Sequence, residues 1–121
     1  MPVTLDMDSL RQAIERRDAN MLISLYADDA QLQVIDHRHP PSAPLELRGK
    51  QAISDFVADI FKRDITHHVS DEVIGRDRVS FNEACQYPSG EKVLSASVLD
   101  LQNGQIIRQT MIQAWDESKE G

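Results

Sequence analysis

The sequence predicts an α+β domain, with helices in its N-terminal half and an antiparallel sheet in its C-terminal half. Apolar residues recur at helical spacing in the first half, most clearly over residues 53–61. After Asp64 the helical stripe stops, and four strand-like runs follow. Because 121 residues is near the common size of one domain, we expect a single domain over residues 1–121.

Two short helices are expected at the N-terminus. Asp8 or Ser9 can cap a first helix that extends to about Arg17. Asp18 restarts the helical pattern, and the apolar stripe of a second helix extends through Tyr26.

The period changes to strict alternation from Gln31, which predicts a strand over residues 31–35. The strand ends in the segment DHRHPPSAP, residues 36–44, whose three prolines favour a stiff, non-helical loop. The clearest amphipathic helix follows over residues 47–64, with its first turn after Gly49.

Four strands are expected over residues 65–74, 78–88, 92–102 and 105–115. The separators GRD, PSGE and NG form turns, and NG is a strong hairpin signal. These short connections predict an antiparallel meander.

Composition and charge exclude several classes of partner. The net charge of −7 is spread along the chain, so nucleic acid and anionic lipid would be repelled. No apolar run approaches the roughly 20 residues of a membrane helix, so we expect no membrane partner. The start MPVTLDMDSLRQ lacks the features of a secretory signal, and the single Cys85 cannot form an internal disulfide, which favours the cytoplasm.

Three segments carry a family resemblance. SLYADDAQLQV, residues 24–34, resembles the helix-to-strand junction of SnoaL-like polyketide cyclases and ketosteroid isomerases. LRGKQAISDF, residues 47–56, resembles their G-x-x-A-I third helix, and LDLQNGQIIRQTMIQAWD, residues 99–116, resembles their closing hairpin. The order and spacing resemble the nuclear transport factor 2-like superfamily over nearly the whole chain.

The resemblance implies a cone-shaped, curved antiparallel sheet with a mixed edge, wrapped around N-terminal helices. It also implies a small, mostly apolar ligand at the open end of the cone. Because this fold serves isomerases, cyclases, dehydratases, epoxide hydrolases and non-catalytic binding modules, it does not by itself imply one activity.

The chain departs from the family at the positions that carry its chemistry. Ketosteroid isomerases use an aspartate base with a tyrosine and a protonated acid as oxyanion hole. The resemblance puts Val34, Leu10 and Val98 at those three positions. The last strand also lacks a cyclase-type carboxylate before Asp116, so neither mechanism is expected in its usual form.

Glu83 is the first catalytic candidate. Alternation places it on one strand face with Val79, Phe81, Cys85 and Tyr87. A buried carboxylate is normally paired or has a raised pKa. Two interpretations stay open: Glu83 is a general base, or cross-strand glutamines or an inward arginine satisfy it in a structural role.

Asp36 and His67 are the other catalytic candidates. Asp36 shares the parity of Val34 and is expected at the pocket mouth, whereas His37, Arg38 and His39 form its rim. His67 and His68 are adjacent on a strand, so only one of them can enter the cone.

No metal or other cofactor is expected, because the sequence has no Cys pair, H-E-x-x-H motif or carboxylate-rich loop. Cys85 is expected as a small core residue, since a neighbouring glutamate raises the pKa of a thiol.

The expected ligand-binding residues are apolar, aromatic or amide side chains on inward positions: Tyr26, Val34, Phe56, Phe81, Cys85, Val98, Gln109, Met111, Gln113 and Trp115. The glutamine amides can hydrogen-bond a ligand carbonyl or its enolate.

Two functions are therefore expected in competition. The first is a cofactor-independent isomerase, cyclase or dehydratase that transfers protons on an apolar ligand with a carbonyl or hydroxyl group. The second is a non-catalytic ligand-binding or dimerisation module. The outward positions Ile106, Thr110, Ile112 and Ala114 are apolar for a solvated face, so a homodimer through the open sheet face is expected with either function.

Overall fold

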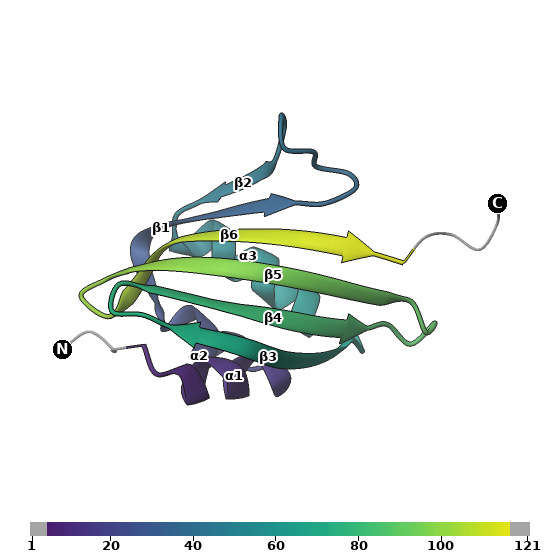
Figure 1. Ribbon diagram of the computed structural model, residues 1–121, viewed down its shortest axis with the longest axis horizontal. Coiled ribbons are helices and arrows are strands. Elements are labelled where there is room, and N and C mark those ends of the chain that lie inside the picture. The colour runs from purple at the N-terminus through teal and green to yellow at the C-terminus, as the bar shows by residue number, and fades with distance from the viewer. Residues whose placement is uncertain (1–4, 117–121) are drawn as a thin grey trace.

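The computed structural model describes residues 5–116 (Figure 1). Residues 1–4, on which part of the expectation about a secretory signal rests, and residues 117–121 lie outside the described part. The elements are α1 (Met7–Glu15), α2 (Ala19–Ile23), β1 (Tyr26–Ile35), β2 (Leu45–Arg48), α3 (Lys50–Phe61), β3 (Thr66–Ile74), β4 (Arg78–Gln86), β5 (Lys92–Gln102) and β6 (Gln105–Trp115). None of the helices within residues 5–116 has the length and apolarity needed to cross a membrane.

The strands form one curved, unclosed sheet in the order β2-β1-β6-β5-β4-β3. β1 and β6 pair in parallel and all other pairs are antiparallel, which confirms the predicted α+β class with its mixed sheet. The helices lie on one side of the sheet, with α3 behind β5 and β6 (Figure 1). Leu10 of α1 and Ile53 of α3 are fully buried against Leu32 and Leu99 of the sheet, so the core fills the concave side.

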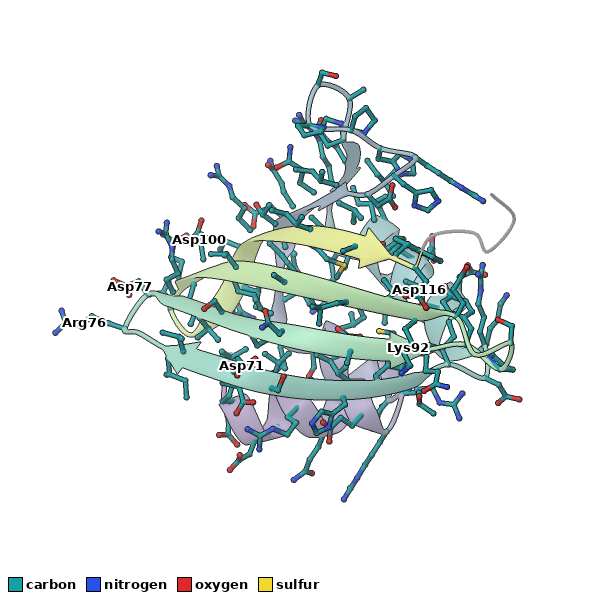
Figure 2. The ribbon with its side chains drawn as sticks, turned by 45° about the vertical axis from the view of Figure 1, so that its right-hand side comes forward. Asp71, Arg76, Asp77, Lys92, Asp100 and Asp116 are labelled. Carbon is teal, nitrogen blue, oxygen red and sulfur yellow. The ribbon has the colours of Figure 1, made fainter. Side chains whose placement is uncertain are left out.

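The three hairpins of the meander are closed as the turn sequences predict. Asn103 and Gly104 both have positive φ, at 54° and 77°, the conformation that an NG hairpin turn requires. At the opposite end, the backbone N–H of Lys92 donates to the Asp116 carboxylate at 2.9 Å, which ties the start of β5 to the end of β6 (Figure 2).

The junction between α2 and β1 differs from the prediction. The second helix ends at Ile23, and β1 begins at Tyr26 instead of Gln31. Tyr26 pairs with Ile106 of β6, and the register is irregular between Tyr26 and Gln31. Pairing with a strand eighty residues away therefore overrides the local helical stripe.

The short strand β2 was not predicted. It follows the proline-rich loop, overlaps the first two residues of the segment expected as the third helix, and pairs antiparallel with β1, Val34 opposite Leu45. Four residues are too few for a visible alternation, so only pairing to β1 reveals the strand.

A β-bulge in β6 corrects one predicted orientation. Ile106 pairs with Leu101 and Arg108 pairs with Asp100, so Ile107 is the extra residue and the alternation shifts by one. The expectation that Ile106 faces outward is wrong, because its side chain is fully buried. Beyond the bulge, Ile112 and Ala114 are exposed as predicted.

Candidate active site

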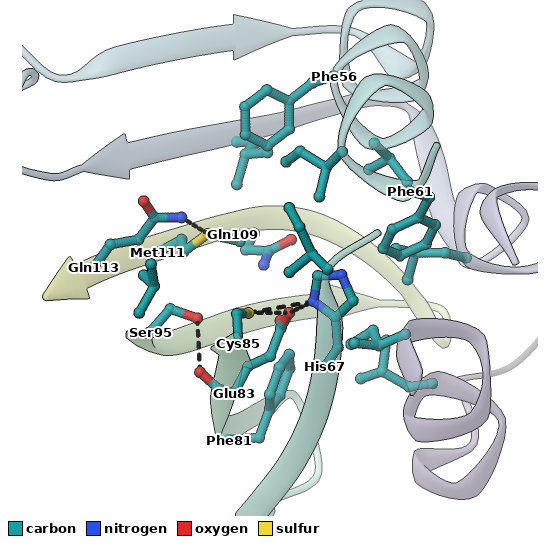
Figure 3. A pocket seen from close by; sticks show the side chains of 18 of the residues that line it. Phe56, Phe61, His67, Phe81, Glu83, Cys85, Ser95, Gln109, Met111 and Gln113 are labelled. Carbon is teal, nitrogen blue, oxygen red and sulfur yellow. Dashed lines mark hydrogen bonds and ion pairs between the residues drawn. The ribbon is translucent and has the colours of Figure 1, made fainter. Parts of the chain in front are cut away.

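A pocket of about 140 Å³ opens on the concave side of the sheet. Its apolar wall comes from the three helices and from the sheet, and includes Leu10, Ile14, Leu22, Phe56, Ile60, Phe61 and Phe81 (Figure 3). Its polar groups are few, as in most sites for small apolar molecules. They are Tyr26, His67, Glu83, Cys85, Tyr87, Ser95, Gln109 and Gln113.

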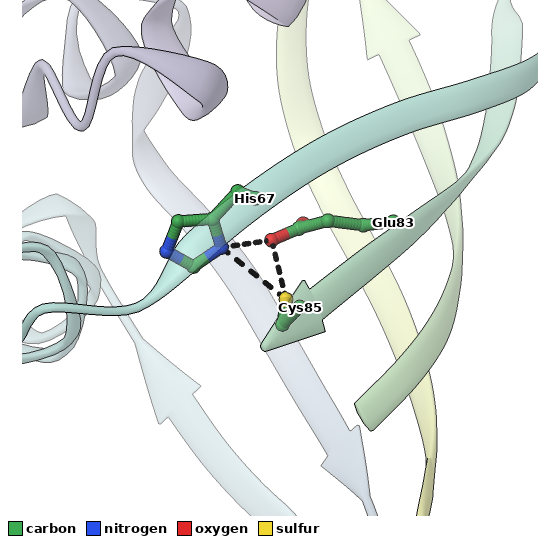
Figure 4. Close-up of side chains that lie close together, drawn as sticks. All are labelled: His67, Glu83 and Cys85. Carbon is green, nitrogen blue, oxygen red and sulfur yellow. Dashed lines mark hydrogen bonds and ion pairs between the residues drawn. The ribbon is translucent and has the colours of Figure 1, made fainter. Parts of the chain in front are cut away.

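His67, Glu83 and Cys85 form a polar cluster on the pocket wall (Figure 4). His67 of β3 is paired across the sheet with Cys85 of β4, and Glu83 lies two residues along the same strand. Because side chains alternate along a strand, this register places all three on one face. His68 faces the other way and is exposed.

The three side chains of this cluster converge on one carboxylate oxygen. His67 Nδ1 lies 2.7 Å from Glu83 Oε2, and the Cys85 thiol donates to the same oxygen at 3.2 Å. Nδ1 and Sγ are themselves 3.2 Å apart. The other carboxylate oxygen, Oε1, accepts no hydrogen bond from the described residues, and the Glu83 side chain is 12% exposed.

This pairing matches neither interpretation of Glu83 fully, the free general base or the carboxylate satisfied by glutamines or an arginine. Among residues 5–116 the basic side chain within ion-pair distance of Glu83 is His67, which is charged only when protonated, and no arginine or lysine lies within that distance. The carboxylate is therefore held in place but is not neutralised by a permanent cation.

The contacts of His67 select its tautomer. A bare Nδ1 lone pair 2.7 Å from a carboxylate oxygen would be repelled, so Nδ1 carries the proton and donates it to Glu83. Nε2 then keeps the lone pair, and it is the one buried side-chain polar atom without a hydrogen-bond partner in the described part of the chain. The imidazole lies edge-on to Phe61, with ring centroids 5.6 Å apart.

Burial, and then the charge of Glu83, raise the pKa of the Cys85 thiol above its ordinary value. The thiol therefore stays protonated and donates its hydrogen to Glu83. This protonation state makes Cys85 a poor nucleophile in the protein as it stands.

A second polar group crosses the floor of the pocket. The Tyr26 hydroxyl donates to Gln109 Oε1, and Gln109 Nε2 donates to Ser97 Oγ at 3.1 Å. Burial, and then Glu83, raise the pKa of Tyr26, so the phenol remains a donor. The amide carbonyl of Gln109 is thus occupied, and one N–H of the amide donates no hydrogen bond to the described residues.

Replacing Tyr26 with phenylalanine should destabilise the protein by about 1–3 kcal/mol, because the Gln109 carbonyl is left buried without a donor. Urea unfolding of the variant measures the loss. Phe56→Leu, which changes a pocket side chain without a hydrogen bond, is the matched control and should cost less. A Tyr26→Phe variant as stable as the parent would contradict the role of this bond.

Of the remaining expected ligand-binding residues, some line the pocket, one lies in the core and one lies on the outer face of the sheet. Met111, Gln113 and Trp115 line the pocket from β6, and Trp115 Nε1 donates to Gln113 Oε1 at 3.1 Å. Val34 belongs to the buried core and does not line the pocket. Val98 is 42% exposed on the outer face, so its expected inward orientation is wrong.

The resemblance predicted an inward Val98, and alternation could not correct this because both faces of β5 carry apolar residues. The inward side chains of β5 are Val93, Ser95, Ser97 and Leu99. Ser95, which the sequence did not single out, lines the pocket, and so does Tyr87, which alternation placed on the Glu83 face. Several outward residues of β5 are apolar too, so alternation along β5 does not indicate which set of side chains faces inward.

Asp36 organises a turn and does not line the pocket. Its Oδ1 accepts the backbone N–H groups of Arg38 at 2.9 Å and His39 at 2.8 Å, and lies 3.0 Å from His39 Nδ1. Desolvation acts to raise the pKa of Asp36, but these hydrogen bonds outweigh it and hold the pKa below the ordinary value. His37, also in this loop, is exposed, and its ring lies 5.1 Å from that of Trp115.

Removing the Asp36 carboxylate in Asp36→Ala should cost about 1–2 kcal/mol of stability at pH 7. Because the folded pKa lies below the unfolded value, the contribution is present above about pH 4 and is lost as the pH falls through the folded pKa. Urea unfolding at pH 7 and pH 3 should therefore show the difference between variant and parent shrinking in acid. Asp29→Ala, at an exposed position of β1, is the control and should leave the unfolding midpoint unchanged. A difference that grows in acid would contradict the assignment.

Comparison with known proteins gives the same fold. The model of the SnoaL-like domain family matches residues 8–109. A protein from Mesorhizobium loti, described as NTF2-like and of unknown function, superposes with a TM-score of 0.78 at 16% identity, over 89% of this chain and 87% of its own. No match was found among the curated proteins.

Two further structures carry functional descriptions. A candidate ketosteroid isomerase from Kribbella flavida superposes with a TM-score of 0.74 at 15% identity, over 95% of this chain and 78% of its own. A candidate polyketide cyclase from Sinorhizobium meliloti gives a TM-score of 0.65 at 16% identity, over 87% of this chain and 91% of its own. At this identity the likeness concerns the fold. The match to the domain model over most of the chain shows that this protein belongs to the SnoaL-like domain family and has the nuclear transport factor 2-like fold.

Proposed function

We propose that this protein catalyses cofactor-independent proton transfer on a small apolar ligand that carries a carbonyl or hydroxyl group, with Glu83 as the general base. The observation that carries the proposal is the state of Glu83. It lines an apolar pocket with Oε2 held by His67 and Cys85 and with Oε1 free of hydrogen bonds from the described residues. A base for proton transfer needs this combination of fixed orientation and an accessible oxygen.

The reaction would begin when Glu83 Oε1 accepts a proton from the carbon next to the ligand carbonyl. Negative charge then develops on the carbonyl oxygen, which the amide N–H groups of Gln109 and Gln113 in the pocket would stabilise. Glu83 can return the proton to another carbon, which is an isomerisation, or to a departing hydroxyl, which is a dehydration. His67 and Cys85 hold the carboxylate and would act as positioning residues.

The cavity limits the size of the ligand. Its volume of about 140 Å³ is close to that of a dry apolar cavity of about 150 Å³ that binds benzene. The buried part of the ligand is therefore the size of one ring or a short branched chain. A fused four-ring steroid would have to project out of the pocket.

Hydrogen exchange tests this function. We would incubate the protein in D₂O with a panel of monocyclic ketones and follow deuterium at the carbons beside the carbonyl by NMR. Fluorescence of Trp115, which lines the pocket and is the only tryptophan, reports binding in parallel. Exchange above the buffer rate supports the proposal. Binding without exchange favours a non-catalytic ligand-binding module, and the absence of both contradicts an apolar pocket function.

The binding module is the second candidate because Nδ1 of His67, Oε2 of Glu83 and Sγ of Cys85 contact one another without a ligand. The outer face of the sheet supports self-association with either function. Leu94 and Ile112 are each 54% exposed there, on the strands β5 and β6. We propose a homodimer through this face, and the free thiol of Cys85 supports a reducing location such as the cytoplasm.

Ile112→Asp should convert the dimer to a monomer, because it places a charge at the centre of this apolar face. Light scattering coupled to size exclusion measures the mass of parent and variant at the same concentration. Val73→Asp changes a residue of similar exposure on β3, at the far edge of the sheet, and should leave the dimer intact. A parent protein that is monomeric at micromolar concentration would contradict the homodimer.

A further inference from the structure

His67, Glu83 and Cys85 offer three different metal-ligand atoms that point at one another. Nδ1, Oε2 and Sγ all lie within 4.8 Å of each other, and in residues 5–116 this is the one group of three His, Cys, Asp or Glu side chains that meets this condition. We propose that the cluster binds one Zn²⁺ ion through these three atoms, with the fourth position open to the pocket. The combination of imidazole nitrogen, carboxylate oxygen and thiolate sulfur suits zinc, and three protein ligands with an open position are typical of its catalytic sites.

The present triangle needs little adjustment to hold the ion. Its edges are 2.7, 3.2 and 3.2 Å, whereas a tetrahedral zinc site requires edges of about 3.3–3.6 Å from its metal–ligand distances. Side-chain rotations that move the ligand atoms of Glu83 and His67 by about half an ångström accommodate this change. The strands can stay in place, because their register already puts the three residues on one face (Figure 4).

Zinc would replace the two hydrogens that now fill the centre of the cluster. The Cys85 S–H bond breaks and its proton leaves to solvent, while the imidazole proton moves from Nδ1 to Nε2. One proton is therefore released for each ion bound. The charge of Zn²⁺ is balanced by one thiolate and one carboxylate, so the pocket would bury a formally neutral group.

The surroundings of His67 fit this arrangement. Its side chain is 3% exposed and its Nε2 has no hydrogen-bond partner among the described residues, so the ring is held by packing with Nδ1 turned to the cluster. In the zinc form, the N–H at Nε2 would lie beside the Phe61 ring, which can serve as a weak acceptor (Figure 3).

A zinc site here would differ from the expectation that the chain binds no metal. The usual zinc motifs bring ligands close in sequence, whereas here one ligand comes from β3 and two from β4, sixteen and eighteen residues further on. The zinc site stands on donor geometry and does not depend on the proton-transfer proposal. If both proposals hold, Oε2 coordinates the zinc ion, and the ion's open coordination position would polarise a ligand carbonyl in addition to the proton transfer by Glu83.

The test uses the untagged, reduced protein after treatment with a chelator. Titration with ZnCl₂ in a calorimeter, repeated in buffers of different ionisation enthalpy, should give one ion per chain and release of one proton. Titration with CoCl₂ should produce a near-ultraviolet band of thiolate-to-cobalt charge transfer together with intense visible bands of tetrahedral cobalt. Both readouts are independent of turnover.

Cys85→Ser should remove the charge-transfer band and weaken zinc binding by more than about 100-fold, the upper end of what loss of an outer partner costs. Glu83→Gln preserves the shape of the side chain and should weaken binding similarly. His68→Ala, at the neighbouring outward position, is the matched control and should bind like the parent. Circular dichroism verifies the fold of each variant.

Three results would overturn the site: no stoichiometric zinc binding at micromolar concentration, a cobalt complex without the thiolate band, or equal zinc affinity in the parent and Glu83→Gln. Deuterium exchange by the metal-free protein tests proton transfer separately, so a failure of the zinc site can be distinguished from a failure of the proposed function. Exchange without zinc binding leaves proton transfer standing, and zinc binding without exchange leaves the metal site standing.

Discussion

Glu83→Gln is expected to lower the rate of ligand hydrogen exchange by about 10²–10⁴-fold, because it removes the general base while keeping the size of the side chain. The glutamine carbonyl can still accept the hydrogen bonds of His67 Nδ1 and Cys85 Sγ, so the pocket should keep its shape. The measurement is the exchange rate of the best ketone of the panel at saturating concentration, in the metal-free protein.

Two comparisons isolate the chemical step in this variant. Trp115 fluorescence should show ligand binding close to that of the parent, because Glu83→Gln changes no apolar wall of the pocket. Glu46→Gln alters an exposed carboxylate on β2 and should leave the exchange rate unchanged. An unchanged rate in Glu83→Gln would place the base elsewhere and remove the main support for catalysis by this carboxylate.

Ile106→Asp is expected to unfold the protein or to destabilise it by at least about 3–5 kcal/mol, a large part of the stability of an ordinary domain. Ile106 is fully buried beside Tyr26 of β1, and no lysine or arginine is buried among residues 5–116. Thermal unfolding followed by circular dichroism measures the loss.

Ile112→Asp is the matched control, because it makes the same change six residues along the same strand. Ile112 is 54% exposed beyond the bulge, so this variant should stay folded, with monomer stability within about 1 kcal/mol of the parent. The reverse order of stabilities would show that the bulge at Ile107 is misplaced and that Ile106 faces solvent.

The two functional proposals meet at one cluster and make opposite demands on Glu83. As a base it must keep an accessible oxygen with a lone pair, whereas as a zinc ligand it commits Oε2 to the ion. The geometry allows both, because His67 and Cys85 contact Oε2 and leave Oε1 toward the pocket. Any change that added zinc makes to the exchange rate would therefore come from its binding to Oε2, His67 and Cys85 or from its open coordination position, because Oε1 stays free.

Long periodic segments were predicted well. The amphipathic stripe around Ile53 and Val57 produced α3, and the four later strands appear where alternation and turn residues placed them. The inward position of Glu83 also follows from alternation, because β4 is regular and apolar on one face. In these elements the local pattern agrees with burial in the fold.

The sequence limited the histidine partner of Glu83 to two candidates but did not decide between them. Its place beside Cys85 follows from spacing two along a strand, and one of His67 and His68 had to face inward. Which of them does so depends on the register of β3 against β4, which sets His67 opposite Cys85. Register arises from pairing between strands and is not written in either strand alone.

The sequence by itself determined the α+β class, the regular helices and strands, and the residues available for chemistry, because periodicity and turn propensity act over a few neighbouring residues. Tertiary structure decided the start of β1 at Tyr26, the strand β2, the burial of Ile106 and the exposure of Val98. It also brought His67, Glu83 and Cys85 to one point. Each of these depends on pairing between distant strands or on a single bulge, and one residue of shift moves a side chain to the opposite face of the sheet.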